Sequence, residues 1–224
     1  MRDLYWSWFR RVERRLSRVE GPTVELGSGI GNFKEFMPDV VATDVVPTEW
    51  ADEVVDAARL PYDDGSLANL VLIDVLHHLP SPAGALGEAA RALRPGGRFV
   101  ALEPYCSPAS TLVWRTFHHE RVDLTADPFA QGAQTGRDPF DANTALPTLI
   151  FWRYLPELER RLPELALVAR ERFACLVYPL SGGFTGPRLC PPRVGRVLMA
   201  VDDRLDGVAG ALGYRCLITL ERRA

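Results

Sequence analysis

From residue 23 onward, short apolar segments alternate with helical segments, and this alternation constrains the fold more than any other feature of the chain. Strands are expected where apolar residues run together, and helices where they recur every three or four positions. The predicted strands are Thr23–Leu26, Val40–Thr43, Glu53–Val55, Asn69–Ile73, Arg98–Glu103, Leu165–Phe173 and Arg215–Glu221. The predicted helices among them are Asn32–Met37, Ala83–Leu93 and Phe151–Arg161. Such alternation indicates an α/β fold with a parallel sheet and right-handed crossovers.

Two long segments interrupt the alternation. Residues 105–150 are rich in proline, aspartate and glycine, and residues 174–213 are irregular at first and then show the apolar stripe of a helix from Val194 to Leu212. Both follow predicted strands at their carboxyl ends, which is the edge where sheets of this kind bind ligands. We therefore predict one doubly wound α/β domain over residues 23–224, with insertions at 105–150 and 174–213 that form the pocket for a second ligand.

Residues 1–22 precede the first predicted strand. Apolar residues recur at helical spacing over residues 4–19, arginines occupy much of the other face, and Gly21 and Pro22 end the pattern. We expect an amphipathic helix that covers the ligand-binding edge as a lid. The alternative is a helix that lies on an anionic membrane surface through its apolar face.

A glycine turn joins the first predicted strand to the first helix. The segment Glu25-Leu26-Gly27-Ser28-Gly29-Ile30-Gly31-Asn32 lies at the point where such sheets bind ligands. Glycines there allow a tight turn and a close approach of a ligand to the backbone. Asp44 ends the second strand, where a carboxylate can accept hydrogen bonds from both hydroxyls of a ribose. The combination indicates a nucleoside-bearing cofactor.

The spacing of the glycines distinguishes between cofactors. A dinucleotide fingerprint places its third glycine three residues after the second, and that position here is Asn32, because the third glycine comes early at Gly31. Glu25 would bring negative charge close to a pyrophosphate, whereas it suits the ammonium group of a methionine moiety, directly or through water. A nicotinamide-dependent oxidoreductase is therefore the less favoured alternative.

The glycine segment resembles the first motif of class I S-adenosylmethionine-dependent methyltransferases, within the small-molecule group that has a Methyltransf_11-type domain. Further resemblances follow in the same order along residues 23–104: Asp56-Ala57, Leu60-Pro61-Tyr62-Asp63-Asp64-Gly65-Ser66, Asp74-Val75-Leu76-His77-His78-Leu79 and Leu93-Arg94-Pro95-Gly96-Gly97-Arg98. Ala68-Asn69 departs from the Phe-Asp that the family often has before its fourth strand. The later insertions resemble a bacterial subset of the family.

The resemblance implies a Rossmann-like, seven-stranded, mostly parallel sheet whose last strand is antiparallel. It also implies S-adenosylmethionine as cofactor and S-adenosylhomocysteine as product. The implied cofactor-binding residues are Glu25, Gly27, Ser28, Gly29 and Gly31 near the methionine part, Asp44 at the ribose, Val45, Asp56 and Ala57 at the adenine, and Asp74 on the methionine side.

The acceptor side of the site is expected in the first insertion. Transfer of a methyl group to a hydroxyl benefits from a general base, and histidine is the suitable residue near neutral pH. The candidate catalytic residues are His118 and His119, with Glu120 as orienting partner, followed by His77 and His78. We expect no metal ion, because the cysteines form no C-x-x-C pair and three adjacent residues on a helix would point in different directions.

The expected function is methyl transfer to an oxygen, or less readily a nitrogen or carbon, of a small-molecule, sugar or lipid-linked acceptor. The net charge of −3 gives no electrostatic reason to expect nucleic-acid binding, and no segment has the length of a membrane span, so the expected location is the cytoplasm. A non-catalytic regulatory or scaffold protein that binds the same cofactor is the alternative from another class. The acceptor, the methylated atom and the oligomeric state stay open.

Overall fold

The sheet organises the molecule, and the computed structural model describes it together with its helices over residues 2–130, 141–181 and 191–224. Its strands are β1 (Thr23–Leu26), β2 (Val41–Asp44), β3 (Glu53–Val54), β4 (Leu67–Ile73), β5 (Leu93–Pro104), β6 (Leu165–Phe173) and β7 (Arg215–Arg222). They form one seven-stranded sheet in the order β3-β2-β1-β4-β5-β7-β6. Only β7 runs antiparallel to its neighbours, β5 and β6. The predicted fold class is confirmed.

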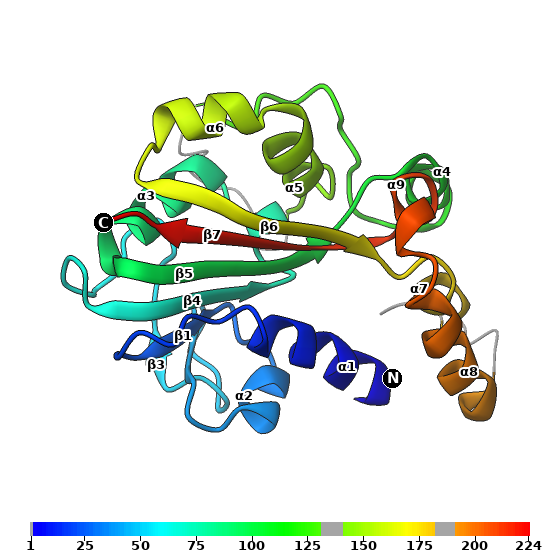
Figure 1. Ribbon diagram of the computed structural model, residues 1–224, viewed down its shortest axis with the longest axis horizontal. Helices are drawn as coiled ribbons and strands as arrows, with labels where there is room; N and C mark the ends of the chain where they lie inside the picture. The colour runs from blue at the N-terminus through cyan, green and yellow to red at the C-terminus, as the bar shows by residue number, and fades with distance from the viewer. Residues whose placement is uncertain (1, 131–140, 182–190) are drawn as a thin grey trace.

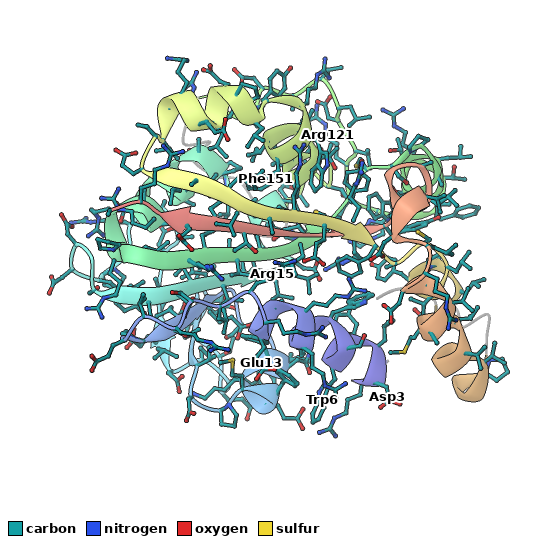
Figure 2. The ribbon with its side chains drawn as sticks, in the orientation of Figure 1. Asp3, Trp6, Glu13, Arg15, Arg121 and Phe151 are labelled. Carbon is teal, nitrogen blue, oxygen red and sulfur yellow. The ribbon has the colours of Figure 1, made fainter. Side chains whose placement is uncertain are left out.

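Helices cover both faces of this sheet (Figure 1). On one face lie α3 (Pro82–Ala92) and α6 (Leu155–Arg161), and on the other lie α1 (Arg2–Glu13) and α2 (Asn32–Phe36). Successive strand side chains point to opposite faces, so Leu70 and Leu72 of β4 join the first apolar cluster and Val71 joins the second. Phe151, which is fully buried between the sheet and the helices of the first face (Figure 2), adds to the first cluster.

The N-terminal helix is shorter than the sequence predicts. It ends at Glu13 rather than near residue 19, because the residues that follow form hydrogen bonds with distant parts of the chain. The N–H of Ser17 donates to Oδ1 of Asn69 at 2.6 Å, and the Ser17 hydroxyl donates to the carbonyl of Gly96. Asn69 also donates to Thr23. Asn69, where the chain departs from the family pattern, therefore connects residues 1–22 to the sheet through hydrogen bonds.

The apolar face of α1 is buried inside the protein. Leu4, Trp8, Phe9 and Val12 are its buried side chains, and they belong to the apolar cluster on that face of the sheet. A membrane-surface role for this helix would require these side chains to leave the core. No described helix is long and apolar enough to cross a membrane.

The first insertion contains more helix than its composition indicates. Ser107 caps α4 (Pro108–Phe117), and the hydroxyl of Ser107 accepts from the N–H of Ser110. After the undescribed residues 131–140 come α5 (Leu146–Thr148) and a π-helical turn (Leu149–Arg153). The helix predicted from Phe151 thus begins only at Leu155, where Pro156 lies in its first turn, a position that proline favours.

The second insertion forms two short helices and one longer one within its described residues. They are α7 (Val177–Ser181), α8 (Pro192–Asp202) and α9 (Ala209–Leu212), with a 3-10 turn at Asp206–Val208 before α9. The single helical stripe predicted from Val194 to Leu212 is therefore interrupted. The helices α4 of the first insertion and α7, α8 and α9 of the second lie at one end of the sheet, at the right in Figure 1, whereas α5 of the first insertion lies over one face of the sheet.

Candidate functional site

The glycine turn after β1 is tied directly to the end of β2. The N–H of Ser28 donates to the carbonyl of Thr43 at 2.8 Å, and the N–H of Gly29 donates to Oδ2 of Asp44 at 3.0 Å. Gly27, Gly29 and Gly31 all have positive φ, a conformation that glycine adopts without strain. The structure therefore brings together the turn and the acidic residue that the sequence analysis paired.

Two polar groups beside this turn fit the expected cofactor. Glu25 is 2% exposed, and neither its Oε2 atom nor the hydroxyl of buried Ser28 has a hydrogen-bond partner among the described residues. Burial, and then the charge of Asp44, raise the pKa of Glu25 to about 8. A neighbouring ammonium group would favour the ionised carboxylate and supply the missing hydrogen bond. The residues thus fit the methionine end of S-adenosylmethionine.

The residues expected at the adenine follow along the same edge. Val45 is 53% exposed directly after Asp44, so its apolar side chain is available to a ring. The N–H of Val55 donates to the Asp44 carbonyl, which places the next residue, Asp56, near the end of β2. Asp56 lines a cavity of about 650 Å³, and its carboxylate accepts only the N–H of Ala58 within the described residues. Ala57 is buried beside it.

Asp74 occupies a strained position at the end of β4. Its φ is +59°, which is uncommon for a residue with a side chain and is often found at functional sites. Its Oδ1 atom accepts a hydrogen bond of 2.5 Å from Nη1 of Arg215, the first residue of β7. Arg215 is not among the site residues predicted from the sequence. Its pairing with Asp74 spans 141 residues and depends on the antiparallel placement of β7 beside β5.

A buried acid–base pair fixes the segment after Asp74, where a 3-10 turn covers Leu76–His78. Glu103 is fully buried and accepts from the N–H groups of Val75 and Leu76 and, at 2.6 Å, from Nδ1 of His77. Burial alone lowers the pKa of His77, but the charge of Glu103 and its hydrogen bond raise it to about 9. His77 is therefore an imidazolium near neutral pH, which makes it a donor rather than a base. Glu103, like Arg215, is not among the site residues predicted from the sequence.

Glu120 lies at the centre of three imidazoles. Its carboxylate is 3.6 Å from Nε2 of His77, 3.9 Å from Nε2 of His78 and 3.8 Å from Nδ1 of His118. Although burial raises the pKa of Glu120, the three histidines lower it to about 2. His119 is exposed and stacks on His118. The candidates named from two distant segments thus meet, with His119 at their edge.

These side chains line a cavity of about 170 Å³. Its volume is well below the roughly 300–1,000 Å³ of a complete small-molecule pocket. The residues around it are Asp74, His77, His78, Pro104, Trp114, His118, His119, Glu120, Thr144, Tyr178 and Arg215. Because Asp74 and Arg215 belong to the same wall, the cavity adjoins the side of the site expected to hold the methionine part of the cofactor.

His78 and His118 differ in the hydrogen bonding of their Nδ1 atoms. Burial lowers the pKa of both, so both are neutral imidazoles near pH 7. Nδ1 of His118 accepts the N–H of Glu120 at 3.2 Å, which leaves the ring proton on its other nitrogen. Nδ1 of His78 is buried and has no hydrogen-bond partner in the described parts of the chain. His78 can therefore accept a proton without losing an existing hydrogen bond.

The geometry also bears on metal binding. His77, His78 and Glu120 each offer a ligand atom, and these atoms lie within 4.8 Å of one another. The helix assumed for residues 118–120 is wrong: α4 ends at Phe117, and the following turn directs Glu120 towards the two histidines. Three ligand atoms at this spacing are compatible with an ion, although the sequence predicts none here.

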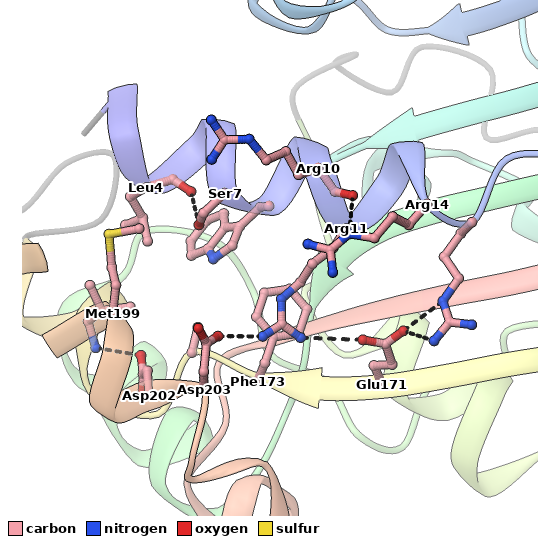
Figure 3. A pocket seen from close by; sticks show the side chains of 14 residues that line it. Leu4, Ser7, Arg10, Arg11, Arg14, Glu171, Phe173, Met199, Asp202 and Asp203 are labelled. Carbon is pink, nitrogen blue, oxygen red and sulfur yellow. Dashed lines mark hydrogen bonds and ion pairs between the residues drawn. The ribbon is translucent and has the colours of Figure 1, made fainter. Parts of the chain in front are cut away.

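A third cleft lies between α1, β6 and α8 (Figure 3). It has a volume of about 520 Å³, and Arg11 bridges Glu171 of β6 and Asp203 at the end of α8. Arg15 pairs with the same glutamate. These ion pairs hold α1 against the sheet and the second insertion, so this cleft is explained as a structural junction.

Known proteins provide an independent comparison for this arrangement. Residues 24–101 match the family model described as a methyltransferase domain. A demethylmenaquinone methyltransferase of Thermus thermophilus is 30% identical over 183 residues, which cover 72% of this chain and 76% of that protein. A 27-O-demethylrifamycin SV methyltransferase of Amycolatopsis mediterranei is 46% identical over 48 residues, 21% of this chain and 18% of that protein.

Structural similarity extends over nearly the whole chain. A SAM-dependent methyltransferase from Archaeoglobus fulgidus aligns with a TM-score of 0.59 and 16% identity, covering 99% of this chain and 95% of that one. Several curated relatives are longer, and the chain spans less than a third of their length. The match to the family model, the Thermus relative and the geometry of the glycine turn agree: the chain belongs to the S-adenosylmethionine-dependent methyltransferases.

Proposed function

We propose that the protein transfers the methyl group of S-adenosylmethionine to a hydroxyl oxygen of a small-molecule, sugar or lipid-linked acceptor, with His78 as general base. The observation that carries this proposal is the cavity of about 170 Å³ beside Asp74, in which a neutral His78 faces the ionised Glu120. The name of the Amycolatopsis relative, which refers to an O-demethyl acceptor, agrees with an oxygen as the methylated atom.

The residues of the cavity divide the work. Glu120 lies 3.9 Å from Nε2 of His78, and its negative charge orients the ring. The neutral ring of His78, which lines the cavity, takes the proton of the acceptor hydroxyl as the oxygen attacks. His77, held by Glu103, carries a positive charge next to Glu120 and keeps that carboxylate ionised.

The bound cofactor supplies a methyl group on a positively charged sulfur, and displacement in line leaves a neutral thioether. The chain's main contribution is then position, because this reaction depends on the alignment of the oxygen with the methyl carbon. The narrow cavity restricts the acceptor end, while the glycine turn, Asp44 and Asp56 are proposed to hold the nucleoside. Residues 105–150 and 174–213 are proposed to set the specificity for the acceptor, and α1 is proposed to act as a lid.

A pH profile of kcat tests the assigned charges. The pKa of His78 lies below its ordinary value of 6.5, so the decline of activity in acid is expected below pH 6.5. The pKa of His77 is about 9, so a second decline is expected above that pH, as the positive charge beside Glu120 is lost. The profile is measured with methyl-labelled S-adenosylmethionine and a panel of phenols, sugars and lipid-linked sugars.

The same assay separates the alternatives. Label in a base-stable ether product supports oxygen transfer, whereas cofactor binding with no transfer to any acceptor class would favour the non-catalytic scaffold. We expect dialysis against EDTA to leave the rate unchanged. A rate that is lost on chelation and restored by a divalent cation would contradict the general-base assignment and make His77, His78 and Glu120 metal ligands.

A further inference from the structure

Arg215 is the strongest unexplained feature near the site. Its side chain is 2% exposed, yet a guanidinium is almost never fully buried unless it is well paired. Only Nη1 is engaged, in the 2.5 Å hydrogen bond to Asp74. Nε and Nη2 are buried and have no hydrogen-bond partner within the described residues. A buried donor without a partner destabilises the folded protein, so these two donors indicate that a ligand binds here.

The surroundings of Arg215 hold the guanidinium in one orientation. Its central carbon lies 5.3 Å from the ring centre of Trp8 on α1 and 5.7 Å from that of Tyr178 on α7. The two rings also contact each other, with their centres 5.8 Å apart. Cation–π contacts of this kind are strongest where water is excluded. Arg215 is thus preorganised, and it lines the same cavity as Asp74 and Tyr178.

The charge balance of the pair specifies its ligand. Asp74 also has a buried oxygen, Oδ2, with no partner in the described parts of the structure. The pair therefore has donors and an acceptor to spare, while its net charge is zero. A lone anion would meet the negative charge of Asp74, and a lone cation would meet Arg215. A zwitterion, with a carboxylate and an ammonium on one carbon, matches both halves at once.

We propose that Arg215 binds the α-carboxylate of the methionine moiety of S-adenosylmethionine, while Asp74 accepts from the neighbouring ammonium. Arg215 lies outside residues 24–101, which match the methyltransferase domain, so this chain supplies the contact from its last strand. The inference rests on the proposed function, because it assumes that this cofactor binds at the glycine turn. The other source of such a carboxylate is an amino-acid group on the acceptor.

Calorimetric binding of three ligands separates the parts of the cofactor. S-adenosylhomocysteine has the whole amino-acid group, its decarboxylated analogue keeps the amine but lacks the carboxylate, and 5′-methylthioadenosine lacks both. We expect the wild-type protein to bind S-adenosylhomocysteine about 10- to 100-fold more tightly than the decarboxylated analogue, as is typical of a hydrogen bond between charged groups. Equal affinities for these two ligands would overturn the proposal.

Arg215→Lys keeps the charge beside Asp74 but removes the planar pair of donors. We expect this variant to bring the two affinities within about threefold of each other, while its affinity for 5′-methylthioadenosine stays that of the wild type. Arg172→Lys is the matched control, since Arg172 also lies over a ring, that of Tyr105, without lining the cavity. It should leave all three affinities unchanged.

The remaining outcomes are also decisive. If Arg215→Lys keeps the wild-type ratio and raises only the KM of an acceptor, the carboxylate belongs to the acceptor and the proposal is wrong. If the lysine variant does not fold, as judged by circular dichroism, the neutral double variant Arg215→Gln/Asp74→Asn replaces it with the same expectation. If the wild-type protein binds none of the three ligands, the proposed function itself fails.

Discussion

Replacing Gly27 with alanine is expected to cause the largest loss of stability and of cofactor binding among single substitutions in the glycine turn. A Cβ at residue 27 would lie 2.4 Å from Cγ2 of Val75 and 3.1 Å from Cγ1. Val75 cannot easily retreat, because its N–H is held by the buried Glu103. The φ of +73° adds the cost of a left-handed conformation.

Crowding of about 1–3 kcal/mol and left-handed strain of about 1–2 kcal/mol give a total near 3 kcal/mol. For a chain of this length that corresponds to a fall in Tm of roughly 6–12 °C, measured by thermal unfolding without ligand. The double variant Gly27→Ala/Val75→Ala should recover most of the crowding part, because the two clashing methyl groups are gone. Gly87→Ala, in open space on α3, is the control that should be neutral or slightly stabilising.

An unchanged Tm in Gly27→Ala would mean that Val75 does not lie over the turn in solution. Failure of the second substitution to restore any stability would also contradict the packing described for this pair. Binding of S-adenosylhomocysteine, measured on the same samples, should fall with stability and recover with it if the turn is the cofactor site.

Replacing His78 with glutamine is expected to lower kcat by about 10²- to 10⁴-fold, the usual contribution of a general base. Glutamine preserves much of the volume and removes the basic nitrogen. The affinity for S-adenosylhomocysteine should stay that of the wild type, because His78 lines the cavity rather than the glycine turn. Transfer of labelled methyl groups and calorimetric binding measure the two effects separately.

Three further variants show whether His78 is the right histidine. His119→Gln should change kcat little, because His119 is exposed and stacks only on His118 among the described rings. Glu120→Gln should reduce kcat, since the carboxylate that orients the ring of His78 is lost. A larger loss of kcat in His118→Gln than in His78→Gln would reverse the assignment of the base.

Local patterns in the sequence were sufficient for the sheet and for the glycine turn. Each strand shows its apolar residues within the segment itself, and the turn needs only residues 27–31 and the end of the next strand. The break in α1 was different, because it depends on hydrogen bonds from Ser17 to Asn69 and Gly96, which lie more than 50 positions away. The helix predicted as far as Leu212 also ends earlier than predicted, at Asp202.

The same distinction between local patterns and long-range contacts applies to the site. The sequence named His77, His118 and Glu120 from chemistry alone, but their meeting depends on the turn that follows α4. The partners Glu103 and Arg215 were not predicted. Each lies in a predicted strand, and each contacts its partner only because of the order of the strands in the sheet. The available signal was a charged residue at the end of an apolar strand. Glu103 directly follows Val100-Ala101-Leu102, and Arg215 is the first residue of the last strand.

The central claim, that the glycine turn and Asp44 hold S-adenosylmethionine, is tested most directly by isothermal titration of the purified protein. The ligands are S-adenosylmethionine, S-adenosylhomocysteine and NAD, and the comparison protein is Asp44→Ala. We predict micromolar binding of both sulfur nucleosides, a loss of about 100-fold or more in the variant, because two hydrogen bonds to a charged group disappear, and no competition by NAD. Binding of NAD in their place, or equal binding by Asp44→Ala, would contradict the account.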